Sequence, residues 1–123
     1  NQVAIKNDVS NEEWIDWAQP VWMDIRETNT LNERVAREQA DERHICPLQL
    51  DFIERCVRLW SNPGETVLSP FAGIGSEIYQ AVKFGRVGLG IELKESYWRT
   101  AVDNLITLEN DLSAPSLFDG VTA

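Results

Sequence analysis

A short turn with two glycines is the part of the sequence best suited to holding a ligand. It runs through Phe71-Ala72-Gly73-Ile74-Gly75, between a short apolar segment and an amphipathic one. Glycines let the backbone turn sharply and approach a ligand closely. The free N–H groups at the start of a following helix point outward and attract anionic or polar groups. The pattern therefore predicts a ligand-binding loop between a strand and a helix.

The acid Glu92 adds a second feature of a cofactor site. It follows the next apolar segment, residues 87–91. An acid at the end of the second strand can accept hydrogen bonds from both ribose hydroxyls of an adenosine cofactor. Together, Gly73, Gly75 and Glu92 indicate an adenosine-containing cofactor. The simpler interpretations are that the two glycines only form a tight turn and that Glu92 is only an acid at the end of a strand.

Other cofactor classes fit these residues less well. A dinucleotide fingerprint needs a third glycine where Ile78 stands, so a nicotinamide or flavin domain is a weaker alternative. No Gly-Lys-Ser/Thr sequence follows the glycines, which excludes a Walker phosphate loop. His44 is the only histidine, and Cys46 and Cys56 are not a Cys-x-x-Cys pair. We therefore expect no metal site.

Helix and strand patterns alternate around the glycine turn. Apolar residues recur at helical spacing between Pro47 and the turn at 61–64, and Gly85 stands where a helix-capping glycine belongs. Strands that alternate with helices predict a parallel sheet, for which two strands alone are too few. The expected elements are a helix opened by Pro47, a strand over 66–68, a helix over 76–84, a strand over 87–91 and a helix over 94–108.

The remainder of the chain carries weaker signals. Residues 21–25 could form a short strand, and the charged stretch that follows is expected to be a solvated loop or a surface helix around 32–41. We interpret Trp14, Trp17 and Trp22 as packing residues. The expected division is a preceding region over 1–43, a core over 44–109 and an irregular tail over 110–123.

Composition limits the function classes. The 123 residues carry a net charge of −9, which argues against a free-standing nucleic-acid binder because such proteins present a basic face. No apolar run approaches the roughly 20 residues needed to span a membrane, and no signal-peptide pattern opens the chain. Two cysteines fit a reducing compartment. We therefore expect a cytoplasmic location, in a bacterium or a phage-infected host.

The motifs resemble those of a known enzyme family. The segment 70–75 resembles the Asp-Pro-Phe-x-Gly-x-Gly signature of S-adenosylmethionine-dependent methyltransferases that act on adenine N6 or cytosine N4 of DNA. Residues 44–50 look like the family's tenth motif, and 88–92, with Tyr97 beyond, look like its second. The order tenth, first, second is that of the permuted beta class, and 20–25 is similar to phage-encoded members. The resemblance covers about residues 14–108 and implies a partial Rossmann-like α/β fold.

The resemblance also implies roles for individual residues around S-adenosylmethionine. The glycine turn would line the amino-acid and ribose portions of the cofactor, and Glu92 would hold the ribose hydroxyls. The methionine end of the cofactor would be bordered by His44, Cys46 and Pro47, which lie where the chain enters the first expected helix of the core. Ser69 stands where the family usually has an acid. The implied cofactor-binding residues are Ser69, Phe71, Ala72, Gly73, Gly75, Glu92, His44, Cys46 and Pro47.

The family's catalytic motif is missing from these residues. In this class a Pro-Pro-Tyr/Phe/Trp segment precedes the tenth motif, and the chain contains no Pro-Pro pair. We expect no catalytic residue here. We interpret the chain as the cofactor-binding, C-terminal part of a longer DNA amino-methyltransferase of the restriction-modification type, which acts by base flipping. The alternative is a non-catalytic remnant or assembly module with the same fold, and an RNA or protein acceptor is also conceivable.

Partners follow from the same interpretation. DNA would be bound through the full-length enzyme, with little affinity from this acidic chain alone. No membrane partner is expected. The open edge of a small sheet also allows a homo-oligomer.

Overall fold

The computed structural model describes residues 8–31 and 46–114. The surface helix considered around residues 32–41 lies outside the described residues, as does the boundary between 43 and 44. Within them, four helices and two strands alternate in the expected order after the first helix. The elements are α1 (Asn11–Trp17), α2 (Leu50–Trp60), β1 (Thr66–Ser69), α3 (Ser76–Lys83), β2 (Val87–Gly90) and α4 (Glu95–Ser113).

The two strands form a parallel sheet. Thr66 pairs with Val87 and Ser69 pairs with Gly90. Parallel neighbours need a crossover, which α3 supplies between them. The parallel α/β fold predicted from the alternating patterns is confirmed, and Gly85 caps α3 with a φ of 76° as expected.

Two strand glycines allow α3 to lie close to the sheet. A Cβ at Gly88 would lie 2.6 Å from Ile78 Cγ2, and a Cβ at Gly90 would lie 3.0 Å from Ile78 Cγ1. The buried Ile78 side chain thus fills the space that side chains at these two strand positions would need. Close helix–strand packing, which a dinucleotide fold obtains from a helix glycine, is obtained here from glycines on the strand.

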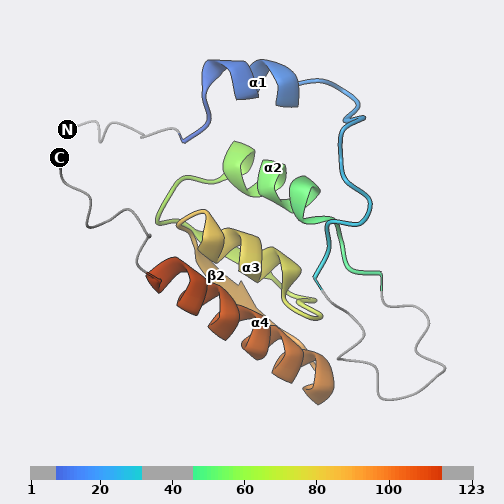
Figure 1. The fold of residues 1–123 in the computed structure, drawn as a ribbon, viewed down its shortest axis with the longest axis vertical. Coiled ribbons are helices and arrows are strands. Elements are labelled where there is room, and N and C mark those ends of the chain that lie inside the picture. Colours follow the sequence, from blue (N-terminus) through green and yellow to red (C-terminus); the bar gives the residue numbers. More distant parts are fainter. Residues whose placement is uncertain (1–7, 32–45, 115–123) are drawn as a thin grey trace.

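The core lies between α2 and the β1–α3 unit. Leu50, Ile53 and Val57 of α2 are buried. Packed against them are Leu31, Val67, Tyr79 and Phe84. Figure 1 shows α2, α3 and α4 side by side in one layer, with α3 in the middle and β2 behind it. No helix in the described part of the chain is long and apolar enough to cross a membrane.

The strand expected over residues 21–25 is not formed, so this prediction was wrong. The segment runs beside α2 and is held by side chains. Trp22 Nε1 donates to the Trp17 carbonyl at 2.8 Å, and the Trp22 ring meets Phe52 edge-on at 5.7 Å. The Arg55 guanidinium lies 5.2 Å from the Trp22 ring. A strand needs a pairing partner, and the described contacts of this segment go to α2 instead, from Trp22 and Asp24 to Arg55.

One helix and one helix boundary also differ from the sequence-based expectation. Helix α1 was missed, although Ser10 and Glu13 form a reciprocal capping box that announces it. Helix α4 continues to Ser113, five residues past its last buried apolar residue, Leu108. No Gly or Pro interrupts the sequence before Pro115, and the residue before a proline disfavours helix. The irregular tail therefore begins later than residue 110.

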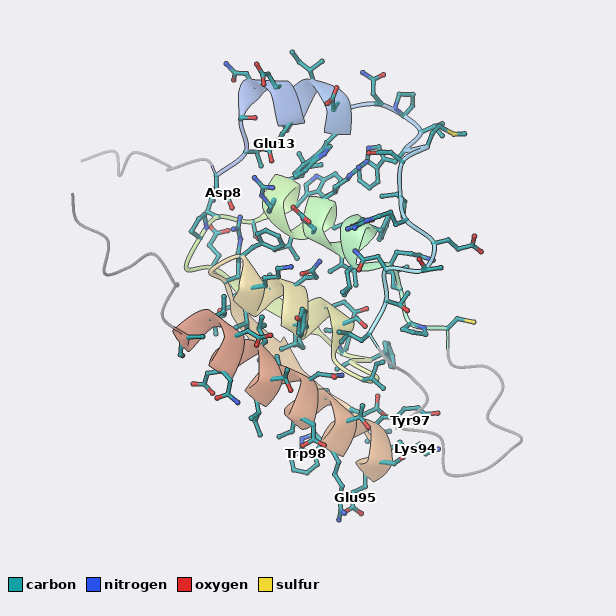
Figure 2. The ribbon with its side chains drawn as sticks, viewed as in Figure 1. Asp8, Glu13, Lys94, Glu95, Tyr97 and Trp98 are labelled. Atoms are coloured by element: carbon teal, nitrogen blue, oxygen red, sulfur yellow. The ribbon has the colours of Figure 1, made fainter. Side chains whose placement is uncertain are left out.

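Ion pairs between largely buried arginines and two partly exposed acids, Asp8 and Glu13, attach the N-terminal segment to the core (Figure 2). The Arg86 side chain is fully buried and donates to both carboxylate oxygens of Asp8, the shorter contact being 2.6 Å. Arg58 donates to both carboxylate oxygens of Glu13 and to the Asp8 carbonyl. The Arg86 hydrogen bonds hold the pKa of Asp8 below its usual value. Because a buried arginine needs its partner, Asp8 stabilises the attachment of α1.

We expect Asp8→Asn to flatten the acid side of the stability profile. A carboxyl whose pKa is lowered by folding contributes stability above its unfolded pKa, and this contribution is lost as pH falls through the folded pKa. The variant should lose about 1.5 kcal/mol at pH 7, and its difference from the wild type should shrink as pH falls below the usual pKa of an aspartate. Urea unfolding at several pH values measures this, with the exposed Asp103→Asn as control. A constant difference at all pH values would contradict the assignment.

Candidate cofactor-binding site

The glycine turn lies at the carboxyl ends of both strands. The Ile91 N–H donates to the Ser69 carbonyl at 3.0 Å, and the Ala72 N–H donates to the Ile91 carbonyl at 2.9 Å. The start of the turn is thus fastened to the end of β2. In open α/β sheets, ligands bind at this edge.

Both turn glycines adopt conformations that favour glycine. Gly73 has a φ of 55° and Gly75 a φ of 88°, in the left-handed region. Gly75 precedes α3 and makes room for α4, because a Cβ there would lie 2.9 Å from Ala101 Cβ. The Asn104 side chain, one turn further along α4, donates to the Ile74 carbonyl at 3.0 Å. Helix α4 therefore fixes the position of the turn.

Glu92 connects the turn to the segment after β2. One of its carboxylate oxygens accepts from the Gly73 N–H and the other from the Lys94 N–H, both at 2.8 Å. Each carboxylate oxygen has a further lone pair that can accept a hydrogen bond. Glu92 is only partly buried. It can therefore hold the turn and accept hydroxyl groups of a ligand at once.

The other expected residues of the turn differ in exposure. Ala72 and Ser69 are buried, and Ser69 ends β1. Phe71 is 88% exposed, so its ring is available to cover a ligand rather than to pack the core. The structure thus brings five predicted residues together at one edge with Phe71 beside them. The five are Ser69, Ala72, Gly73, Gly75 and Glu92.

The described part of the structure contains only two of the three residues expected at the methionine end of the cofactor. His44 lies outside the described residues. Cys46 is exposed and Pro47 is partly buried, in the segment that leads into α2. Figure 1 shows that α2, α3 and α4 all begin on the same side of the molecule. The Cys46–Pro47 segment therefore approaches the side that carries the glycine turn, and its contact with a cofactor stays a prediction.

The start of α4 borders the same edge. Lys94 Nζ lies 4.4 Å from the centre of the Tyr97 ring, and Figure 2 shows both side chains at this end of α4. No group of three or more potential metal-ligating side chains occurs among residues 8–31 and 46–114. The arrangement offers backbone N–H groups, one carboxylate and an exposed aromatic ring, which suits a nucleoside-bearing ligand.

Sequence reasoning missed the residues of α4 that hold the turn. The sequence places Ala101 on the apolar face of this helix but predicts no contact with the turn, and it assigns no role to Asn104. Asn104 is a polar residue next to the buried stripe, and that position was the available signal. Its bond to Ile74 spans 30 residues, which local patterns do not reveal.

A family model described as DNA methylase, for N6/N4 enzymes, matches residues 2–103. The Type II methyltransferase M1.MboII of Moraxella bovis is 37% identical over 65 residues, 53% of this chain and 25% of that protein. The Type II methyltransferase M.ScaI of Streptomyces caespitosus is 35% identical over 85 residues, 68% of this chain and 26% of that protein.

The fold has a solved counterpart. A Thermus thermophilus protein described as a DNA modification methylase, solved with S-adenosyl-L-methionine, superposes with a TM-score of 0.64 at 27% identity. The match covers 83% of this chain and 34% of that one. The chain thus spans about a quarter of the curated relatives and about a third of the solved one. With most of its length matched by the family model, the chain belongs to the family of N6/N4 DNA methylases.

Proposed function

We propose that the chain binds S-adenosylmethionine at the carboxyl ends of β1 and β2. The observation that carries the proposal is the Glu92 carboxylate, which holds the Gly73 N–H and keeps lone pairs available for two ribose hydroxyls. The solved relative with S-adenosyl-L-methionine supports this choice of cofactor. When bound, the cofactor supplies an activated methyl group on a sulfonium.

The residues of the chain fit such a cofactor. Gly73 has a positive φ, and a Cβ there would meet no atom within 4 Å, so this part of the turn is open to a ligand. The N-terminus of α3 directs N–H groups toward the ligand side of the turn and favours polar atoms of a ligand there. The exposed Phe71 ring would cover an apolar portion of the cofactor. We assign Cys46, Pro47 and His44 to its methionine end.

The substrate we propose is an exocyclic amine of DNA, at adenine N6 or cytosine N4. Family membership supports this acceptor, and the relatives described as Type II methyltransferases support a restriction-modification setting. The chain has no Pro-Pro pair, so we assign it cofactor binding and assign the handling of the extruded base to other residues. The order of its motifs supports the permuted beta class, and the likeness of residues 20–25 to phage-encoded members supports a phage-type enzyme.

Calorimetric titration with S-adenosylmethionine tests the proposal, with NAD as control. We expect saturable binding of S-adenosylmethionine near one site per chain and no heat from NAD. Ile78 occupies the third glycine position of the dinucleotide fingerprint, which is the reason for the negative expectation. Binding of NAD alone would replace the proposal with a dinucleotide domain.

A further inference from the structure

A buried glutamine connects α3 to the start of α2. Gln80 of α3 is 2% exposed, although its side chain is polar. Its Nε2 donates to the Leu50 carbonyl at 2.6 Å, across 30 residues of sequence. Its Oε1 has no hydrogen-bond partner among the residues that the structure describes. The bond to Leu50 is therefore what a glutamine contributes here that an apolar side chain would not.

Packing alone does not account for a glutamine at this position. A buried amide oxygen without a partner destabilises a fold, and an unbranched methionine would fill the space without such an oxygen. A hydrogen bond fixes its two partners more narrowly than an apolar contact does, because it depends on both distance and direction. The effect of Gln80 is therefore expected in the placement of α2 along α3 rather than in overall stability.

That placement matters because the two helices begin at the two halves of the cofactor site. Gly75 ends the glycine turn between one and two helical turns before Gln80. Pro47 lies shortly before Leu50. Figure 1 shows α2 and α3 side by side and beginning on the same side of the molecule. The bond from Gln80 to Leu50 is thus a short connection between the turn and the segment assigned to the methionine end.

A second set of hydrogen bonds holds the same helix start from outside. The Asp51 carboxylate accepts from the backbone N–H and the guanidinium of Arg26, and from the Asn29 side chain, at 2.6–3.0 Å. The Leu50 N–H donates to the Asn29 carbonyl at 2.7 Å. The bonds from Arg26 hold the pKa of Asp51 well below its usual value, so this carboxylate stays charged at neutral pH. The first turn of α2 is therefore held between α3 and residues 26–29.

We propose that Gln80 and Asp51 are positioning residues of the cofactor site, which hold the Cys46–Pro47 segment where the amino-acid end of S-adenosylmethionine needs it. Neither residue is assigned a contact with the cofactor. Both act through α2, whose start they fix. Their loss should therefore weaken the binding of the amino-acid end and spare that of the nucleoside portion. The inference rests on the proposed function.

Two ligands that differ only in the amino-acid end test this role. S-Adenosylhomocysteine and methylthioadenosine carry the same nucleoside and an uncharged sulfur, but only the first has the α-amino carboxylate. Calorimetric titration of the full chain measures both affinities. Gln80→Met should lower the affinity for S-adenosylhomocysteine about tenfold and leave that for methylthioadenosine within about a factor of two. An unchanged affinity for S-adenosylhomocysteine, or an equal loss for both ligands, would overturn the role of Gln80.

Arg26→Ala tests the outer contact and leaves the core intact, because the Arg26 side chain is 70% exposed. The affinity for S-adenosylhomocysteine should fall about fivefold, with methylthioadenosine again spared. Arg99→Ala is the matched control, since Arg99 is 69% exposed and also pairs with an acid, Glu95. It should leave both affinities within about a factor of two. Equal effects of the two arginine variants would overturn the role of Asp51.

A variant of α4 separates the positioning of α2 from a general loosening of the site. Asn104→Leu removes the hydrogen bond to the Ile74 carbonyl, so it disturbs the turn that both ligands are assigned to contact. It should weaken both ligands by the same factor. A selective loss of S-adenosylhomocysteine in Asn104→Leu, equal to that in Gln80→Met, would contradict the proposal, because the selectivity would then not report on α2.

Amide hydrogen exchange follows the placement of α2 without a ligand. Circular dichroism first verifies that each variant is folded, and Arg26→Ala keeps the test available if Gln80→Met does not fold. Exchange of the Leu50 N–H should be at least about threefold faster in both variants, and that of the Ala72 N–H, which donates to Ile91, should be unchanged. Unchanged exchange at Leu50 would overturn the proposal. A wild-type chain that binds neither ligand nor S-adenosylmethionine would refute the proposed function, whereas cofactor binding without the selective losses would refute the positioning role alone.

Discussion

Replacing Glu92 by alanine is expected to weaken S-adenosylmethionine binding by about 100-fold or more. The carboxylate is assigned two hydrogen bonds to ribose hydroxyls, and bonds to a charged group contribute about 1.5–3 kcal/mol each. The substitution also removes the carboxylate to which the N–H groups of Gly73 and Lys94 donate hydrogen bonds. The loss of affinity therefore combines a missing ligand contact with a less ordered turn. Calorimetry on the wild type and the variant measures it.

Two further variants separate these contributions. Glu92→Gln keeps the shape and one acceptor oxygen, so we expect an intermediate loss of about tenfold. Glu95→Gln removes the same charge from a side chain that is 72% exposed and pairs with Arg99. The affinity of the Glu95→Gln variant for S-adenosylmethionine should stay within a factor of two of the wild-type affinity. Equal weakening by Glu95→Gln and Glu92→Gln would show that general charge, rather than the Glu92 contacts, supports binding.

The second large effect is expected at Gly75. Gly75→Ala should destabilise the fold by about 3 kcal/mol, because a left-handed φ costs an L-residue about 1–2 kcal/mol and a steric overlap adds about 1–3 kcal/mol. The overlap is with Ala101 of α4, whose Cβ would lie 2.9 Å from the new Cβ and whose Cα would lie 3.3 Å from it. Urea unfolding followed by circular dichroism measures the change.

Gly73→Ala is the matched control in the same turn. Gly73 also has a positive φ, of 55°, but a Cβ there would meet no atom within 4 Å. The variant should lose only about 1–2 kcal/mol, the conformational part of the cost. Combining Gly75→Ala with Ala101→Gly should recover part of the difference, as a double-mutant cycle would reveal. A Gly75→Ala cost no larger than that of Gly73→Ala would refute the close contact with α4.

The core elements could be predicted because their residues carry local signals. The apolar spacing of Leu50, Ile53 and Val57 predicts a helix with one buried face, and the structure buries these residues. The glycine turn could also be located, since its position between a strand and a helix already indicates the edge of a sheet where ligands bind. Glu92 follows from the same topology.

Long-range contacts account for what could not be predicted. The segment at 21–25 resembles a strand in composition, yet Trp22 and neighbouring side chains attach it to α2 instead. The bond from Asn104 to Ile74 depends on how α4 packs against α3. The role of Ile78 appears only when Gly88 and Gly90 are seen opposite it. In each case the deciding partner is distant in sequence.

The measurement that tests the central claim most directly is an amide chemical-shift map of the isotopically labelled chain, titrated with S-adenosylmethionine. The account predicts that the largest changes fall on residues 71–75 and 91–94, where the turn and Glu92 meet. The N–H of Gly73 should move most, since its acceptor Glu92 would share its carboxylate with the ribose. Changes confined to other residues, or none at saturating cofactor, would contradict the assigned site.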